Sequence, residues 1–191
     1  MSNIAILASG SGTNAENIIK YFSTRNTAKV CLVMSNNPNA LVLTRAETLG
    51  VTTVFFDRRD FYDSGVVLNR LISDKIDFIV LAGFLWLVPE TILEKYKGRI
   101  VNIHPALLPD YGGKGMYGDA VHRAVIKSGD KESGITIHFV DNHYDQGDII
   151  FQERCAVDPS DTPESLAGKI HSLEYAHFPP VIEEVIMKLT F

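Results

Sequence analysis

Cysteine, basic residues and long apolar segments are all scarce in this chain of 191 residues, and each scarcity argues against a class of protein. The 2 cysteines, Cys31 and Cys155, lie in apolar strand-like runs without CxxC spacing. We therefore expect reduced core thiols rather than a disulfide framework or a zinc site. The formal net charge is −5 and no Lys/Arg-rich block offsets it, which argues against an electrostatic hold on nucleic acid.

The amino-terminal residues Met1, Ser2 and Asn3 carry no basic side chain and precede only a short apolar run. We therefore expect neither a signal peptide nor a membrane span, and a cytoplasmic location. With 46% hydrophobic and 21% charged residues, the chain can bury a sizeable core. We expect one domain over residues 1–191, without repeats or linkers.

Apolar runs alternate with helix-like segments over the first half of the chain, which predicts an open Rossmann-like α/β fold with helices on both faces of a mostly parallel sheet. Two later strand-like runs predict an antiparallel edge, whose connecting loop at 141–147 is free to fold over a site. The last helix should begin at Pro163, after Asp161 or Thr162 as its cap, and bend or break at Pro179 and Pro180. The expected strands are 4–8, 30–34, 53–56, 78–81, 100–104, 134–140 and 148–157, and the earlier helices are 16–22, 41–49, 66–72, 89–96 and 119–127.

The strand-like run that ends at His104 carries two polar side chains toward one place. Strand residues alternate between faces, so Asn102 and His104 point the same way. Because Pro105 cannot donate a ladder hydrogen bond, the strand should end there and leave the pair at the carboxyl edge of the sheet, where ligands bind in such folds. An amide beside an imidazole suits acyl transfer through an oxyanion. The alternative is that both side chains only hydrogen-bond the neighbouring loop.

A glycine-rich loop follows the first strand and opens the first helix. Free amides at a helix start attract an anion, so the loop with Gly10 and Gly12 is either a phosphate site or a plain tight turn, and Thr13 and Glu16 have capping-box spacing. The loop also fits the loose dinucleotide fingerprint of an oxidoreductase. That class expects an acidic residue after the second strand, where this chain has the run 35–38 of Ser, Asn, Asn and Pro, so a single phosphate is preferred.

A carboxylate in the loop between the two late strands completes the candidate site. Asp145 can fold back to His104, where it would favour the imidazolium, although it could equally be a turn residue. His138 should face the site from its strand or serve as a structural histidine. Lys114 has a role in holding substrate or is simply solvent-exposed.

Together these segments resemble one family, the phosphoribosylglycinamide formyltransferases, which are folate-dependent enzymes of purine biosynthesis, across nearly the whole chain. The Asn-x-His-Pro-x-Leu-Leu-Pro motif with a downstream Asp is specific to folate formyl-group enzymes, and the first loop separates this branch from its relatives. The segments that carry the resemblance are Ser9 to Asn14, Leu81 to Phe84, Asn102 to Pro109, Gly134 to Val140 and the loop of Asp145.

The resemblance implies that Asn102, His104 and Asp145 are the catalytic trio for transfer from 10-formyltetrahydrofolate, without a covalent enzyme intermediate or a metal. It implies small-molecule substrates, a monomer or homodimer, and no membrane or nucleic-acid partner. In the family the ribonucleotide phosphate lies on the first loop and an acid contacts the glycinamide substrate. These positions correspond here to Gly12, Thr13, Asn14 and Glu174, while Leu85, Trp86, Leu87 and Val88, with Asn102, correspond to the folate site.

The chain departs from the family where the folate tail is held, because many relatives have Arg at the place of Trp86 and Ser64 stands in for another Arg. The loop around Lys114 is also richer in glycine than in several relatives. The formyltetrahydrofolate deformylases and the methionyl-tRNA formyltransferases share the trio but add a second domain for which we expect no room here. Deformylase activity, or a phosphometabolite-binding protein without catalysis, is the alternative function.

Overall fold

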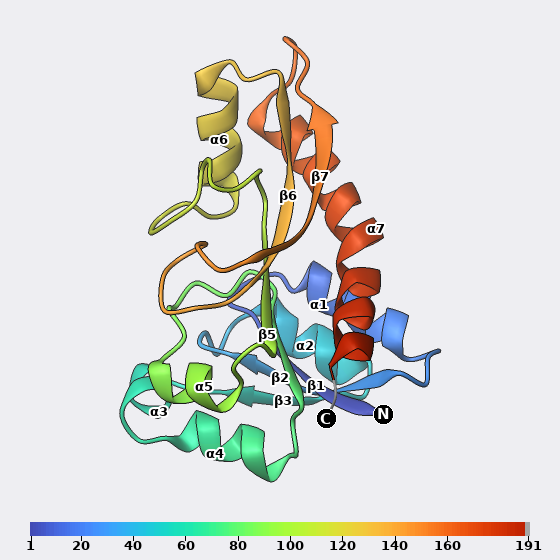
Figure 1. The fold of residues 1–191 in the computed structure, drawn as a ribbon, viewed down its shortest axis with the longest axis vertical. Helices are drawn as coiled ribbons and strands as arrows, with labels where there is room; N and C mark the ends of the chain where they lie inside the picture. Colours follow the sequence, from blue (N-terminus) through green and yellow to red (C-terminus); the bar gives the residue numbers. More distant parts are fainter. Residues whose placement is uncertain (190–191) are drawn as a thin grey trace.

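The computed structural model describes residues 1–189 and forms one seven-stranded sheet in the order β3-β2-β1-β4-β5-β6-β7 (Figure 1). The five strands β3, β2, β1, β4 and β5 are parallel to one another, whereas β6 pairs antiparallel with both β5 and β7, as the sequence predicts. The strands are β1 Ser2–Leu7, β2 Ala28–Ser35, β3 Thr52–Phe55, β4 Phe78–Leu81, β5 Ile100–His104, β6 Glu132–Phe139 and β7 Ile149–Ala156.

Helices cover both faces of the sheet, and each face has its own apolar core. Along β1, Ile4 and Ile6 enter the core on one face and Ala5 and Leu7 enter the core on the other. The first core also takes side chains from α1 Thr13–Phe22, α2 Leu41–Thr48, α6 Asp119–Ser128 and α7 Pro163–Lys188, and the second from α3 Arg58–Tyr62, α4 Val66–Ser73 and α5 Glu90–Lys95. None of the helices described within residues 1–189 is both long and apolar enough to cross a membrane.

Of the expected bend or break at the two prolines of the last helix, the break is wrong, because α7 continues through Pro179 and Pro180 to Lys188. Proline at 179 removes the N–H that would bond the carbonyl of Tyr175 four residues earlier. The side chain of Asn17 donates to that carbonyl instead, with Nδ2 at 2.9 Å from the oxygen. Helix α1 therefore supplies the missing donor, and the predicted cap at Thr162 is confirmed by its bond from the Ser165 N–H.

The helix α3 was not expected from the sequence. It is 5 residues long, too short to show helical periodicity, and its only local signal is the reciprocal cap between Asp57 and Asp60. The two cysteine thiols are free as expected, but both side chains are half-buried rather than buried.

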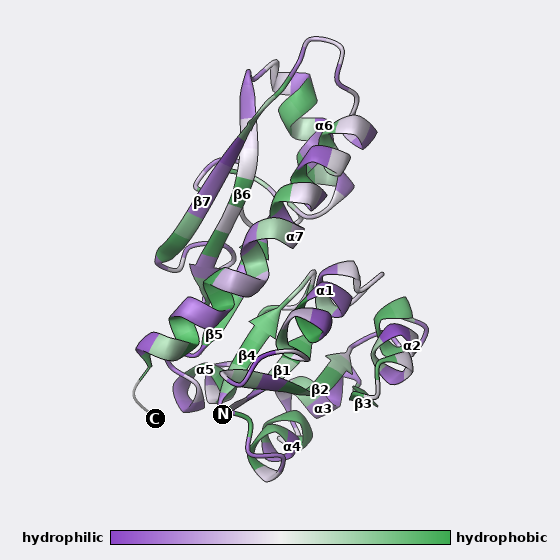
Figure 2. Cartoon of the chain, turned by 90° about the vertical axis from the view of Figure 1, so that its right-hand side faces the viewer, coloured by the Kyte–Doolittle hydropathy of each residue, from purple (hydrophilic) through white to green (hydrophobic). Residues whose placement is uncertain are grey.

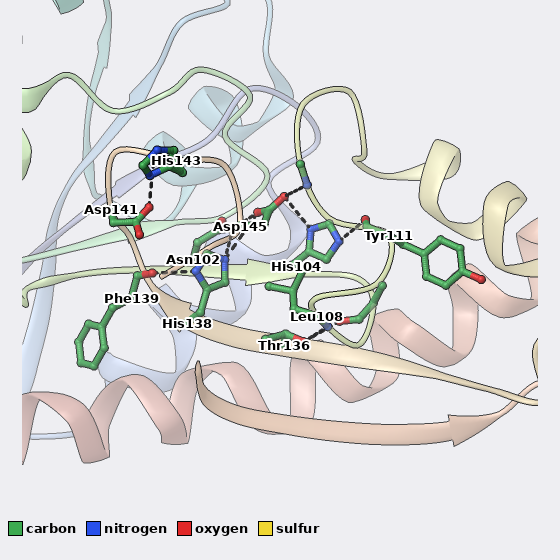
Figure 3. A network of polar contacts seen from close by, with 12 residues as sticks. Asn102, His104, Leu108, Tyr111, Thr136, His138, Phe139, Asp141, His143 and Asp145 are labelled. Carbon is green, nitrogen blue, oxygen red and sulfur yellow. Dashed lines mark hydrogen bonds and ion pairs between the residues drawn. The ribbon is translucent and has the colours of Figure 1, made fainter. Parts of the chain in front are cut away.

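The sheet brings the predicted polar residues to one place. Strand β5 ends at His104, and the antiparallel register sets Asn102 opposite His138 and His104 opposite Thr136. Figure 2 shows the β6–β7 hairpin extending away from the parallel part of the sheet, with α6 and α7 alongside it. The connection between β6 and β7 carries Asp145 back over the carboxyl end of β5 (Figure 3).

Candidate active site

A cavity of about 580 Å³ lies at the carboxyl ends of β1, β4 and β5. The first loop, the end of β5 and the Asp145 loop all open onto it, as the sequence predicts, and so do the loop at 113–118 and one face of α7. The predicted site residues that line it are Gly12, Thr13, Asn14, Leu85, Asn102, His104, Asp145 and Glu174, and Lys114, which is exposed, also lies on its wall.

Asn102, His104 and Asp145 converge at one side of this cavity (Figure 3). The Asp145 carboxylate lies between the other two side chains, with Oδ2 at 3.6 Å from His104 Nδ1 and Oδ1 at 3.5 Å from Asn102 Nδ2. The His104 side chain is 4% exposed and that of Asp145 is 11% exposed, so the contact lies largely out of water. The fold-back of Asp145 expected from the sequence is confirmed.

Burial and charge act in opposite directions on the His104 imidazole. Burial lowers the pKa of His104 below its ordinary value, while Asp145 and the carbonyl of Tyr111 each counteract that shift. Burial alone would raise the pKa of Asp145, but the nearby His104 and the hydrogen bond from the Gly113 N–H help to lower it overall. The pair therefore combines an anionic carboxylate with an imidazole that is neutral at rest and ready to gain a proton when negative charge develops beside it.

His138 belongs to the site and orients Asn102. Its Nδ1 lies 2.7 Å from the carbonyl oxygen of Phe139, and since a carbonyl only accepts, Nδ1 carries the hydrogen. In the neutral ring Nε2 is then an acceptor, and the Asn102 amide donates to it over 3.0 Å. His138 thus faces Asn102 and Asp145 as one alternative expects, but it is buried and does not line the cavity, so it also has the structural role of the other alternative.

The loop after β5 contacts both members of the His104–Asp145 pair, which the sequence did not indicate. His104 Nε2 lies 2.8 Å from the carbonyl oxygen of Tyr111, and the Gly113 N–H donates to Asp145 Oδ2 over 2.9 Å. Backbone groups make both contacts, so residue types carry no signal for them. His122 and His171 also line the cavity and were missed for another reason, since nothing in their spacing marks them.

The capping box expected from Thr13 and Glu16 is wrong, and no side chain caps the amides at the start of α1. The N-cap is Gly12, at φ 75°, and no side chain caps the helix. Glu16 instead pairs with Lys20 and Arg45. A β-carbon at Gly12 would lie 2.4 Å from Val42 Cγ2, so α2 packs directly against this turn and glycine is required there. The first turn of α1 has no side-chain cap and faces the cavity, an arrangement that suits an anion.

Glu174 reaches the same end of the cavity from α7. The side chain of Asn14 donates to its Oε2 over 2.8 Å, and burial raises the pKa of Glu174. Asn14 Oδ1 is buried and has no hydrogen-bond partner among the described residues. The bond between Asn14 and Glu174 joins the first loop to α7, and Asn14 Oδ1 is left as an acceptor for a ligand.

The segment expected to enclose the folate ring meets the cavity through Leu85 alone. Trp86 packs in a cluster with Phe61 and Tyr62, under the guanidinium of Arg58. The Leu87 carbonyl accepts from the Tyr62 hydroxyl, and Val88 is buried in the second core. The three residues after Leu85 thus support the cavity wall without lining it.

Comparison with known proteins agrees with this geometry. The sequence model of the formyl transferase family matches residues 2–182. The chain is 35% identical over 97% of its length to the phosphoribosylglycinamide formyltransferase of Bacillus subtilis, covering 95% of that protein. It is 36% identical over 96% of its length to the trifunctional purine biosynthetic protein adenosine-3 of Drosophila melanogaster, of which it spans 14%. The crystal structure of phosphoribosylglycinamide formyltransferase from Bacillus halodurans superposes with a TM-score of 0.87 at 37% identity, covering 98% of this chain and 96% of that one.

Proposed function

The chain belongs to the formyl transferase family, and we propose that it transfers the formyl group of 10-formyltetrahydrofolate to the amine of 5'-phosphoribosylglycinamide in de novo purine biosynthesis. The observation that carries the proposal is the convergence of Asn102, His104 and Asp145 in a cavity that also reaches the uncapped start of α1. One cavity thus offers an oxyanion site and a phosphate site. These are the two features that a formyl acceptor bearing a phosphate ester requires.

Transfer by direct attack needs no covalent enzyme intermediate. The amine nitrogen bonds to the formyl carbon, and the carbonyl electron pair moves to oxygen. Asn102 and His104 stabilise that oxyanion, whose charge also favours the imidazolium. The electron pair then returns, the bond to the folate nitrogen breaks, and that nitrogen takes the proton that the amine loses, with Asp145 assisting the relay through water.

The two substrates contact different parts of the cavity wall in this proposal. Gly12, Thr13 and Asn14 bind the ribonucleotide phosphate through their backbone amides, and Glu174 contacts the glycinamide substrate. Leu85, Trp86, Leu87 and Val88 hold the folate, the first by direct contact and the others by shaping the wall. Asn102 contacts the folate in addition to its catalytic role.

The proposal extends to the setting in which the enzyme works. Both thiols are free, which suits the reducing cytoplasm. The substrates are small molecules, so a single domain acting as a monomer or homodimer, with no nucleic acid, membrane or metal, is sufficient.

The decisive assay mixes the protein with both substrates and follows release of tetrahydrofolate. Release that requires the ribonucleotide supports the transferase, whereas equal release without it would identify a deformylase. For the variant His104→Ala we expect turnover to fall by at least about 10²-fold, as for loss of a general acid–base group, while the ribonucleotide still binds. Unchanged formyl transfer in this variant would exclude the proposed role, and binding without turnover in the wild type would identify a binding protein.

A further inference from the structure

Tyr111 holds a backbone conformation that its side chain disfavours. Its φ is 56°, in the left-handed region that a bulky residue rarely adopts. Such a conformation persists only where the surroundings fix it, and such residues cluster at functional sites. The phenol of Tyr111 supplies the fixing contact, since its hydroxyl lies 2.6 Å from Ser128 Oγ and bonds to the carboxylate of Asp130. The side chain therefore ties this loop to the end of α6.

The backbone on either side of this anchor contacts the catalytic pair. The Tyr111 carbonyl accepts from His104 Nε2, and the Gly113 N–H donates to Asp145 Oδ2. A β-carbon on Gly112, between them, would lie 2.7 Å from Leu108 Cδ2 and 3.3 Å from the Asp145 β-carbon. Residues 111–113 thus lie close against Asp145, and a β-carbon at position 112 would require Leu108 to move.

The carbonyl of Tyr111 also decides which nitrogen of His104 faces the reaction. A carbonyl only accepts, so Nε2 keeps its hydrogen and Nδ1 is the nitrogen that gains or loses a proton. Nδ1 lies 3.6 Å from Asp145 Oδ2, beyond ordinary hydrogen-bond distance. A proton on Nδ1 is therefore stabilised by the carboxylate yet free to be donated to an oxyanion in the cavity.

We propose that Tyr111 is a positioning residue for His104. Its phenol, anchored at Ser128 and Asp130, holds the carbonyl that fixes the ring and presents Nδ1–H to the formyl oxygen. This role rests on the proposed formyl transfer. The fixed tautomer, however, is a property of the protein without substrate and can be measured separately.

The test compares the wild type with Tyr111→Phe in two measurements. Nitrogen-15 NMR of the imidazoles, with His104 assigned by its loss in His104→Gln, gives the tautomer and the pKa of His104. The titratable groups that face this ring are Asp145, His138 and His122, and all are unchanged in the variant. We expect neutral His104 to carry its hydrogen on Nε2 in the wild type, and in the variant we expect a mixture of tautomers and a lower pKa.

In the formyl-transfer assay we expect kcat of Tyr111→Phe to fall roughly two- to tenfold, the range for loss of one buried hydrogen bond, with both KM values within about twofold. Tyr21→Phe is the matched control, because its hydroxyl also bonds a carboxylate, that of Glu183, away from the cavity. Asp130→Ala should reproduce the Tyr111→Phe phenotype, and Asp130→Asn, which keeps an acceptor, should restore most of the activity.

The outcomes separate the two proposals. A Tyr111→Phe protein with the wild-type tautomer and titration of His104 overturns the positioning role, whatever its activity or thermal stability. A wild type that shows the Nε2–H tautomer but transfers no formyl group overturns the proposed function and leaves the positioning of His104 intact. If Tyr111→Phe does not fold, Asp130→Ala against Asp130→Asn gives the same comparison without altering Tyr111.

Discussion

Replacing Asp145 with Asn tests the electrostatic basis of the site, because it removes one charge and keeps the shape. At 3.6 Å and an effective dielectric constant of about 20, the carboxylate favours the His104 imidazolium by about 4.6 kcal/mol at most. An amide oxygen that still accepts from Gly113 recovers part of this. At about 1.4 kcal/mol for each factor of ten, we expect kcat of Asp145→Asn to fall roughly 10²- to 10³-fold.

The pH dependence of this loss gives the sharper measurement. Asp145 favours the charged form of His104, so its removal lowers the pKa of His104 further and shifts the fall in activity to lower pH. The ratio of wild-type to variant kcat should therefore shrink as the pH is lowered, and titration of the substrate amine cancels from this ratio. The control is Asp141→Asn in the same loop, whose carboxylate accepts from the His143 N–H and does not line the cavity.

Two results would refute this reasoning. A constant ratio across the pH range would mean that the charge of Asp145 does not act through protonation of His104. A loss as large in Asp141→Asn would mean that the loop, and not the carboxylate beside the imidazole, is what the substitution disturbs. Turnover is followed by tetrahydrofolate release at saturating concentrations of both substrates, so that kcat reports the chemical step rather than binding.

Two further predictions concern the first loop and α6. Gly12→Ala should lower the free energy of unfolding by about 2–4 kcal/mol in urea titration and weaken ribonucleotide binding, because the new β-carbon would meet Val42 at 2.4 Å at a positive φ. Gly10→Ala, whose β-carbon would have nothing within 4 Å, should leave the free energy of unfolding unchanged, and equal losses of stability would contradict the assignment of the turn. Burial lowers the pKa of His122, so the unfolded chain binds more protons below about pH 6.5 and the wild type loses stability as pH falls through that range. His122→Asn should therefore lose less stability than the wild type between neutral and mildly acidic pH, and parallel curves would contradict the shift.

The elements that could be predicted from the sequence are those whose signals are local. Strand β5 was placed correctly because its apolar run is stopped by Pro105, and the shared direction of Asn102 and His104 follows from strand geometry alone. The antiparallel edge also has a local signal, namely two apolar runs joined by a short polar loop. By contrast, α3 has too few residues for periodicity, and the carbonyl that Pro179 leaves without its helical donor in α7 is satisfied by Asn17, which is far away in the sequence.

The site shows the same division. The residue types in the sequence predict the amide, the imidazole and the carboxylate. The groups that decide which ring nitrogens carry hydrogen are the carbonyls of Tyr111 and Phe139, and a residue of any type would supply a carbonyl. A backbone carbonyl has no signature in the sequence, so no pattern could show which nitrogen of His104 or His138 is protonated. The consequence is chemical. Nε2 of His104 donates to the Tyr111 carbonyl and Nδ1 of His138 donates to the Phe139 carbonyl, so a different nitrogen of each ring faces Asp145. Nε2 of His138 already accepts from the Asn102 amide, whereas Nδ1 of His104 is left to take up a proton beside the carboxylate. That difference supports the proposed role of His104 in proton transfer and of His138 in orienting Asn102, although both are buried histidines beside the same acid.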